Sequence, residues 1–420
     1  MVSGRRVLLF KDKPLMGFGL IVIAVCLANF ILNNVNGRFW LSDFNVYYTA
    51  AKNLISGGPV YLHAFGDGSG YYKYSPVILC FFLPYAAFSY YAASVIHFAI
   101  LSFSFFYAFL LVYRMLKKYF FLESIGKEWF LLVLAFGCMV IHLVRELYLG
   151  NINIILLCLS LLALQNYLDG RNRSGSILLG IILLTKPFYL LLLLPLFFRK
   201  KLKAIGILAI TVAAGLIFPF IFMGYDRTLS FYSGWIRIMM LHGTVFPGKN
   251  TLEYMVRYYF IPGLPMYAGL IILLVMVIFS CIFIWFNLEQ EKNRTATGYF
   301  RDQDFIFEWW MLLALIPNLF RTDSEHFLST APLLAFIVFF IASRRIFWMI
   351  PVMIVLIFFY GANSTDLLGS NLSDRLFSMG LLGLSNLLLI MLACGVFLAF
   401  KKSTYLLNGS VDKQGNSPQG

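Results

Sequence analysis

Charged side chains are scarce in this sequence. Only 12% of its 420 residues are Asp, Glu, Lys or Arg, whereas ordinary soluble domains carry about a quarter. Hydrophobic residues make up 60% of the chain, and that excess has to face lipid. No long polar segment is present apart from the last residues, 408–420, which we expect to be disordered. A soluble protein is therefore excluded, and residues 1–407 are expected to form a single transmembrane domain.

The sequence also lacks the usual ligand patterns of metal and redox sites. Its six cysteines all fall in apolar segments, with no metal-binding or redox spacing. Asp302-Gln303-Asp304 has the acidic spacing with which soluble nucleotide-sugar transferases hold a divalent cation. The motif directly precedes an apolar run, however, and aspartates at such a place favour the start of a helix. We therefore expect no metal site and no cofactor.

Apolar runs long enough to cross a bilayer, about 17 to 25 residues each, recur along the chain. Ten of them are expected to form full transmembrane helices, at residues 15–35, 90–113, 129–144, 152–167, 204–223, 264–286, 304–320, 327–342, 346–362 and 379–400. Two further stretches, 76–88 and 176–198, are too short or too broken to be simple crossings. The predicted fold class is an all-α polytopic membrane protein with about ten full transmembrane helices, short re-entrant segments and outer loops that carry interfacial helices.

Basic residues are divided unevenly between the two faces of this predicted bundle. If 176–198 is a hairpin broken at Lys186-Pro187, then 22 of the 33 Lys and Arg fall on the face that holds both termini. Such residues in short loops are retained in the cytoplasm, so loops 36–75 and 224–263 are expected to face away from it. A single kinked crossing at 176–198 is the alternative, and it would invert everything downstream. The net charge of +14 follows from this asymmetry and does not indicate a nucleic-acid partner.

The first outer loop contains a predicted amphipathic helix. Apolar and aromatic residues recur at helical spacing between residues 44 and 55, and Gly57-Gly58-Pro59 ends the run. We expect this helix to lie on the membrane surface with its tyrosines at the headgroup level. Asp43 stands at its start, where a carboxylate accepts backbone N–H groups and the helix dipole favours the ionised form. The residue is either a simple helix cap or a general base.

Cationic residues gather on the same face. Lys73 lies among tyrosines where the chain re-enters the membrane, and it is either a ligand for a phosphate or sugar or an interfacial anchor. Lys186 is flanked on each side by about ten apolar residues, and a lysine at such a depth requires an anionic partner. Two more polar clusters lie at residues 145–153 and 321–326. The acidic and histidine residues of the second do not have a standard metal-ligand spacing.

Six short motifs follow one another along the chain in a fixed order. They are Asp43-Phe44-Asn45-Val46-Tyr47-Tyr48-Thr49-Ala50-Ala51, Gly57-Gly58-Pro59-Val60-Tyr61, Tyr72-Lys73-Tyr74-Ser75-Pro76, Gly150-Asn151-Ile152-Asn153, Thr185-Lys186-Pro187 and Lys249-Asn250-Thr251-Leu252. In this order and spacing they resemble glycosyltransferase family 87, a family in the GT-C superfamily of polytopic membrane enzymes. The resemblance extends from residue 43 to about residue 335. It implies a GT-C type helical bundle.

The resemblance also implies a reaction that uses neither metal nor nucleotide. An ionised aspartate in the first outer loop, Asp43 here, takes the proton from an acceptor hydroxyl. The hydroxyl then attacks the anomeric carbon of a polyprenyl-phosphate-linked sugar and displaces polyprenyl phosphate with inversion. The sugar is a mannose-like hexose or a pentose, and the acceptor is a lipid or a glycan. The setting is the extracytoplasmic face of a plasma membrane, in contact with membrane lipids.

Site residues follow from the same resemblance. The cations expected to bind the donor phosphate are Lys73, Arg145, Lys186 and His326. The residues expected to bind substrate are Tyr47, Tyr72, Tyr74, Asn151, Asn153, Asn250, Asp323 and Glu325. The chain departs from the family at residues 321–326, where many members carry an aromatic residue followed by paired histidines.

Functions of other classes stay open at this point. A transporter or flippase of a lipid-linked saccharide is the main alternative, although such proteins often contain internal repeats and none is visible here. An enzyme that moves an oligosaccharide or a phosphoethanolamine-like group is a second alternative, and a non-catalytic scaffold is a third. A structure distinguishes a glycosyltransferase from a transporter. A glycosyltransferase requires a lipid-open groove that ends at Asp43, whereas a transporter requires a path through the middle of the bundle.

Overall fold

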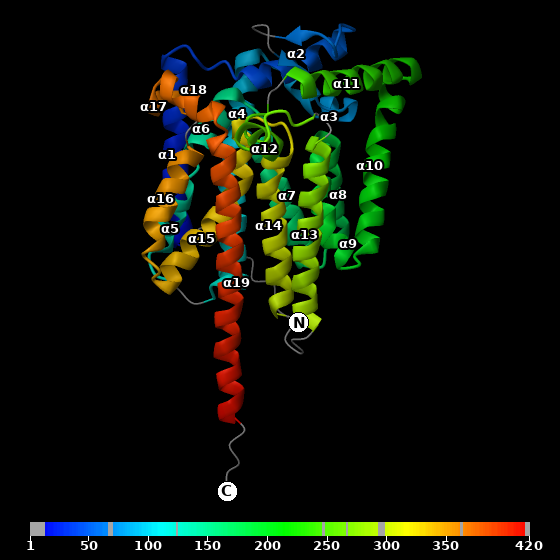
Figure 1. Cartoon of the computed structure of the whole chain (residues 1–420). Coiled ribbons are helices and arrows are strands. Elements are labelled where there is room, and N and C mark those ends of the chain that lie inside the picture. Colours follow the sequence, from blue (N-terminus) through cyan, green and yellow to red (C-terminus); the bar gives the residue numbers. More distant parts are fainter. Residues whose placement is uncertain are drawn as a thin grey trace.

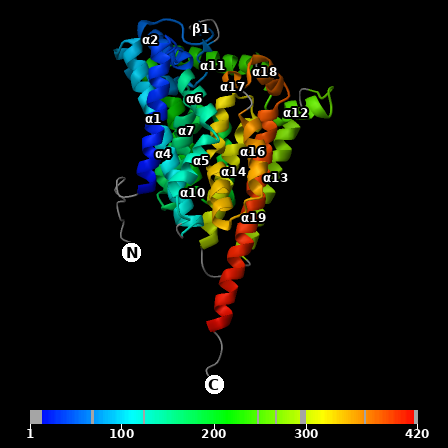
Figure 2. The same cartoon turned by 90° about the vertical axis from the view of Figure 1, so that its left-hand side faces the viewer.

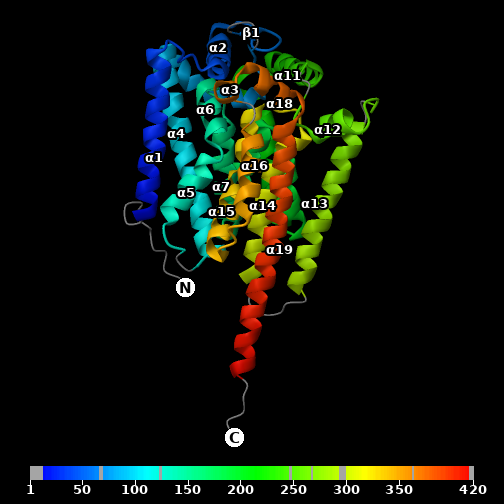
Figure 3. The same ribbon diagram turned by 60° about the vertical axis from the view of Figure 1, so that its left-hand side comes forward.

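The chain folds into a bundle of roughly parallel and antiparallel helices, with further helices lying across one of its ends (Figure 1). This computed structural model describes residues 13–65, 70–122, 125–245, 248–265, 268–292, 299–361 and 364–415. Helices α2 (Ser42–Ser56) and α11 (Tyr225–Val245) lie across the same end in all three views (Figures 1, 2 and 3). We call this end the α2 end.

The opposite end is held together by basic residues and their partners, and we call it the basic end. Lys118 lies 3.9 Å from Asp169, and Lys201 donates to the backbone oxygen of Tyr167 at 3.3 Å. Two ion pairs, Arg199–Glu308 at 2.5 Å and Lys401–Asp304 at 2.8 Å, are buried here. Asp304 of the acidic motif at 302–304 is therefore a buried partner of a lysine, while Asp302 lies in the first turn of its helix, as expected.

Six helical segments among the described residues are long and apolar enough to cross a membrane: Leu15–Val35, Tyr90–Phe120, Leu202–Met223, Ala268–Gln290, Ser324–Arg344 and Leu381–Lys402. They correspond to α1 (Lys13–Val35), α4 (Tyr90–Met115) with the π-helix η2 (Leu116–Phe120), α10 (Leu202–Met223), α13 (Ala268–Lys292), the 3-10 helix η4 (Ser324–Thr330) with α15 (Ala331–Arg344), and α19 (Leu381–Gly415). Helices α5 (Glu128–Gly137) and α6 (Val140–Leu149), bent by 61° at their junction, make a seventh if they count as one span. The protein is thus an all-α multi-pass membrane protein.

Each of the ten predicted segments overlaps helix among the described residues, but not all of these helices have the length of a full crossing. Helices α7 (Asn153–Leu168) and α16 (Met349–Tyr360) have 16 and 12 residues. These lengths correspond to about 24 and 18 Å, which is less than the ~30 Å of bilayer hydrocarbon. Helix α14 (Tyr299–Leu319) is longer, but carries Asp302, Asp304 and Glu308 in its first half. The described residues therefore contain six or seven helices of crossing length, fewer than the ten expected, together with shorter apolar helices.

The segment at 176–198 is a hairpin, as predicted. Its first limb, α8 (Asn172–Thr185), runs parallel to α10, because Ser176 donates to the backbone oxygen of Ala204 at 2.8 Å and Gly215 packs against Leu184. Two neighbouring helices can run parallel only if the chain between them returns. The 3-10 helix η3 (Pro187–Leu192) and α9 (Leu193–Phe198) make that return. The break falls at Lys186, which is extended, as residues before proline prefer.

Helix α2 differs from its expected position in two respects. It begins after Leu41, which has a left-handed conformation, and no side chain caps it. Asp43 is therefore in the first turn without being a cap. Tyr47 and Tyr48 are buried, because the apolar stripe of the helix packs on the rest of the protein. The hydroxyl of Tyr48 donates to the backbone oxygen of Phe88 at 2.8 Å. Gly57, with φ of 80°, ends the helix as predicted.

The remaining elements cover the α2 end or continue the bundle. Strands β1 (Ala64–Phe65) and β2 (Gly70–Tyr71) pair antiparallel, and the glycine-rich segment between them, 66–69, lies outside the described residues. The short helices are α3 (Pro76–Phe82), the 3-10 helix η1 (Leu83–Ala87), α12 (Leu252–Tyr259), α17 (Thr365–Leu368) and α18 (Ser370–Ser378). Helix α19 continues to Gly415, beyond the rest of the bundle (Figure 1). The bounds of α19 thus include residues 408–415. Residues 416–420 lie outside the described residues.

The basic asymmetry predicts which end faces the cytoplasm. Ser56 at the end of α2 and Lys402 of α19 are both exposed. We expect a membrane-impermeant maleimide to label Ser56→Cys in intact cells, and to label Lys402→Cys only after the membrane is permeabilised. The unmodified protein, with its six native cysteines, is the control. Labelling of both variants from the same side would contradict the predicted orientation.

Candidate active site

A cavity of about 500 Å³ opens at the α2 end. Seven parts of the chain contribute to its wall: α2, the segment between β2 and α3, the α6–α7 turn, the tip of the α8–η3 hairpin, α11, the α12–α13 region, and the segment from the end of α14 into η4. Eight of the residues predicted from the sequence line it: Asp43, Tyr47, Lys73, Tyr74, Asn151, Lys186, Asp323 and His326. Segments up to 283 positions apart thus bring their polar residues to one place.

The start of α2 is held against the α6–α7 turn by a close backbone approach. Gly150, which ends α6, has φ of 68°, and a Cβ at this position would lie 2.9 Å from the Cβ atoms of Leu41 and Phe44. Only glycine tolerates both the conformation and the contact. The ring of His97 stacks on Phe44 with centroids 4.3 Å apart, and its Nε2 donates to the Gly150 oxygen at 3.0 Å. This packing brings Asp43 beside Asn151.

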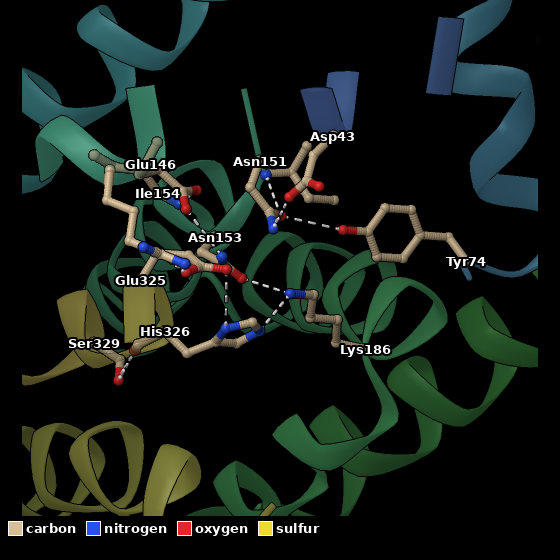
Figure 4. Close-up of polar contacts among 12 residues, drawn as sticks. Asp43, Tyr74, Glu146, Asn151, Asn153, Ile154, Lys186, Glu325, His326 and Ser329 are labelled. Carbon is tan, nitrogen blue, oxygen red and sulfur yellow. Dashed lines mark hydrogen bonds and ion pairs between the residues drawn. The ribbon is translucent and has the colours of Figure 1, made fainter. Parts of the chain in front are cut away.

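Asp43 is a partly buried carboxylate within a polar cluster (Figure 4). Its Oδ2 accepts a hydrogen bond from the side-chain amide of Asn151 at 2.8 Å. Burial raises the pKa of Asp43 above its usual 3.8, and Asp323 adds to this, whereas Lys73, Lys186 and the Asn151 hydrogen bond act in the opposite direction. The loss of hydration thus outweighs the favourable partners in the direction of this pKa shift.

Lys186 lies at the hairpin tip and is buried (Figure 4). Its ammonium group donates to Oδ1 of Asn153 and, at 2.7 Å, contacts Nε2 of His326. An ammonium group has no acceptor, so Nε2 accepts and the His326 ring carries its proton on Nδ1. Tyr74 and Phe188 place their rings 5.9 Å from the same ammonium nitrogen. Lys186 therefore has polar and aromatic neighbours, but no carboxylate within ion-pair distance among the described residues.

Other charged residues of the cavity come from separate elements. Lys73 follows β2, and burial lowers the pKa of its ammonium group, while Asp323, Asp43 and Glu325 raise it. Arg321, at the end of α14, lies 3.7 Å from Glu253 of α12, and Glu253 also pairs with Arg257 at 3.0 Å. Among the described residues, no group of three or more His, Cys, Asp or Glu is placed to hold a metal ion.

One wall of the cavity is apolar. Phe188 and Phe320 stack with ring centroids 5.4 Å apart, and Leu270 and Leu273 of α13 line the same cavity. Leu270 is 61% exposed, and only 11% of the apolar window of α13 is buried within the protein. Helix α13 stands at the edge of the bundle (Figure 3). The cavity therefore joins a charged interior to a surface that is suited to hydrocarbon.

Five predicted site residues do not line the cavity. Asn153 and Glu325 are buried directly behind it, where they contact Lys186 and Arg145. Arg145 itself is half-exposed and donates to Glu325 at 3.3 Å. Tyr72 is completely buried among other tyrosines. The structure places Asn250 away from the cavity, where its side chain accepts from the backbone nitrogen of Gly383 at 3.3 Å. Asn250 thus joins α12 to α19.

Most residues that line the cavity were not predicted as site residues, and Arg321, Trp235 and Phe188 are among them. Arg321 belongs to the polar cluster at 321–326, so the sequence indicated its position but not its role. The indole nitrogen of Trp235 donates to the backbone oxygen of Lys73 at 2.9 Å, which fixes α11 over the segment that carries Lys73. No short motif marks Trp235, because its contact is with a segment more than 160 positions away.

The arrangement agrees with a match of the sequence to a known family. The sequence profile of glycosyltransferase family 87 matches residues 72–300, more than half of the chain. The chain belongs to glycosyltransferase family 87. It is therefore a membrane glycosyltransferase, as the order of its motifs suggested. Lys73, Asn151 and Lys186 lie within the matched range, whereas Asp43 and His326 lie outside it. No curated protein matches the chain.

Proposed function

We propose that this family 87 glycosyltransferase moves a sugar, a hexose or a pentose, from a polyprenyl-phosphate donor to a hydroxyl group of a lipid or glycan acceptor. One observation supports this most strongly. A single cavity holds a carboxylate that is available to accept a proton, two lysines, and an apolar wall open to lipid. A glycosyl transfer from a lipid phosphate requires these three features together.

Asp43 is the proposed general base. Its carboxylate takes the proton of the acceptor hydroxyl while that oxygen forms a bond to the anomeric carbon. Burial raises the pKa of Asp43, and a base with a raised pKa binds the proton more readily than an ordinary aspartate does. The side-chain amide of Asn151 leaves the second oxygen, Oδ1, for the acceptor, because its hydrogen bond goes to Oδ2.

Lys73 and Lys186 are the proposed ligands of the leaving phosphate. When the bond between the anomeric carbon and the phosphate oxygen breaks, the electron pair and a negative charge remain on polyprenyl phosphate. Positioned cations stabilise such a charge most effectively in a site with little water. His326 and Arg321 line the same region, where the guanidinium group of Arg321 adds a further positive charge. The reaction inverts the anomeric centre, since acceptor and phosphate occupy opposite sides of it.

The polyprenyl chain is proposed to lie against the apolar wall formed by Phe188, Phe320, Leu270 and Leu273. The exposed face of α13 continues this wall toward the lipid, so the donor can reach the cavity from within the membrane. The basic residues are concentrated at the opposite end of the bundle. This supports a plasma-membrane orientation in which the cavity opens on the extracytoplasmic face.

Incubation of the purified protein with a panel of polyprenyl-phosphate sugars tests the proposed function. We expect release of polyprenyl phosphate with at least one donor, and transfer of its sugar to an added acceptor. A parallel set with nucleotide-activated sugars serves as the comparison. Transfer from a nucleotide sugar without any release of polyprenyl phosphate would contradict the proposed donor class.

The pH dependence of turnover should report Asp43. Protonated Asp43 cannot accept a proton, so kcat/KM should fall as the pH drops through its pKa, and the fall should begin above the pH expected for a carboxyl of pKa 3.8. Asp323→Asn removes a neighbouring negative charge and lowers that pKa. We therefore expect kcat/KM of Asp323→Asn to begin its fall at a lower pH than kcat/KM of the parent protein. A fall that begins at the same pH or at a higher pH would contradict this coupling.

A further inference from the structure

We propose that Asn151 and Asn153 are positioning residues rather than substrate ligands. Their side-chain amides, which are oriented in opposite senses, hold the carboxylate of Asp43 and the ammonium group of Lys186 in place. The inference rests on the proposed function for its kinetic consequences. It concerns the turn that leads into α7, where Asn151-Ile152-Asn153 lies between Asp43 on one side and Lys186 on the other (Figure 4).

The amide of Asn151 can have only one orientation. Its Oδ1 accepts the backbone N–H of Ile152 at 2.7 Å and lies 3.3 Å from the hydroxyl groups of both Tyr47 and Tyr74. A backbone nitrogen is only a donor, so oxygen must face it. The Nδ2 group is then directed at Oδ2 of Asp43, at 2.8 Å. Both ends of this amide are occupied before any substrate enters.

The amide of Asn153 is oriented in the opposite sense. Its Nδ2 donates to Oε2 of Glu146 at 3.0 Å, and the other oxygen of Glu146 accepts the backbone N–H of Ile154 at 3.0 Å. The carboxylate thus fixes the nitrogen end of the amide, which leaves Oδ1 for the ammonium group of Lys186. Asn153 is 4% exposed and lies behind the cavity wall, so it does not reach a substrate.

The two amides are carried by the same short stretch of backbone. Both residues are buried and stand two positions apart at the start of one helix, so they move as a unit. One presents a donor to an anion and the other presents an acceptor to a cation. Their backbone therefore fixes where the carboxylate of Asp43 and the ammonium group of Lys186 lie relative to each other. Such preorganisation matters because small displacements of reacting groups cost large factors in rate.

Kinetics of single variants separate positioning from substrate binding. Asn151→Ala removes the restraint on the base, so kcat should fall about tenfold or more while donor KM changes by less than about threefold. Asn153→Ala loosens Lys186, so donor KM should rise more than kcat falls. Asn166→Ala is the matched control, since Asn166 is a buried asparagine of α7 whose amide donates only to its own helix, at the Leu162 oxygen. Equal rises in donor KM for Asn151→Ala and Asn153→Ala would overturn the proposal.

A second measurement does not depend on turnover. Carbodiimides react with protonated carboxyl groups, so the pH dependence of labelling at Asp43, located by mass spectrometry, reports its proton affinity. Besides the hydrogen bond from Asn151, the charged groups that act on Asp43 include Asp323, Lys73, Lys186 and Glu146. Asn151→Asp keeps the shape but directs a carboxylate at Asp43, so labelling should persist to a pH about one unit higher or more.

Asn166→Asp makes the same substitution elsewhere in α7 and should leave the Asp43 labelling curve unchanged. An identical curve for Asn151→Asp and the parent protein would overturn the positioning role. Because labelling needs no sugar donor, this result stands even if the panel of polyprenyl-phosphate sugars shows no transfer. In that case the proposed function fails, while the hydrogen-bonded arrangement of Asp43 and Asn151 is still tested.

Discussion

Replacing Asp43 with asparagine is expected to lower sugar transfer by about a hundredfold or more, the usual range for the loss of a positioned general base. Asparagine has nearly the same shape, so the packing of α2 on the α6–α7 turn should survive. The change removes the negative charge and the site that accepts the proton. Initial rates of polyprenyl phosphate release at saturating donor and acceptor measure the effect.

The matched control is Asp226→Asn, which makes the same change in the first turn of α11, another helix of the α2 end. Asp226 is exposed and does not line the cavity. This variant should retain the parent rate. Thermal unfolding of Asp43→Asn should match that of the parent protein, which separates a chemical defect from a folding defect. Transfer by Asp43→Asn at near the parent rate would remove Asp43 as the base and shift attention to Asp323 or Glu253.

Replacing Lys186 with methionine should weaken donor binding about ten- to a hundredfold. A hydrogen bond to a charged group contributes about 1.5–3 kcal/mol, which corresponds to this range of affinity. Methionine keeps the unbranched apolar stem within the hairpin and removes only the ammonium group. Donor KM, or direct binding of a polyprenyl-phosphate sugar, measures the change. The lost contact is with the donor phosphate. A neutral lipid analogue without that phosphate should therefore bind the parent protein and Lys186→Met with equal affinity.

Lys52→Met is the control for this substitution. Lys52 is an exposed residue of α2, with its ammonium nitrogen 5.5 Å from the ring of Tyr48, and it does not line the cavity. Donor affinity should be unchanged in this variant. A parent-like donor affinity in Lys186→Met, with the protein folded, would show that the buried lysine stabilises the hairpin tip through Asn153 and His326 instead of binding donor.

The helices of the bundle were predictable because hydrophobic segments of bilayer length leave a strong local signal. The hairpin was predictable as well, since Lys186-Pro187 breaks it and both of its flanks are basic. The lengths of the helices were less predictable. The end of α7 at Leu168 and the bend between α5 and α6 depend on packing with neighbouring helices, which composition does not encode. The continuation of α19 to Gly415 also lacks a hydrophobic signal.

The site was predictable in part. Polar residues that interrupt apolar segments, such as Asp43 and Lys186, are conspicuous in the sequence, and eight of the predicted residues line one cavity. Their partners were not predictable, because each contact joins distant segments. The sequence indicated a capping role for Asp43, whereas its hydrogen bond is to Asn151, 108 positions away. It also placed Asn250 with the substrate ligands, although the contact of Asn250 is with Gly383.

We propose that the donor phosphate and the general base meet in this cavity. A structure of the Asp43→Asn variant with a bound polyprenyl-phosphate sugar tests it most directly, because the variant should hold the donor without turning it over. We expect the phosphate within hydrogen-bonding distance of Lys186 or Lys73, the anomeric carbon toward residue 43, and the polyprenyl chain along Leu270 and Leu273. A donor bound at another part of the bundle, with its phosphate remote from both lysines, would contradict the claim.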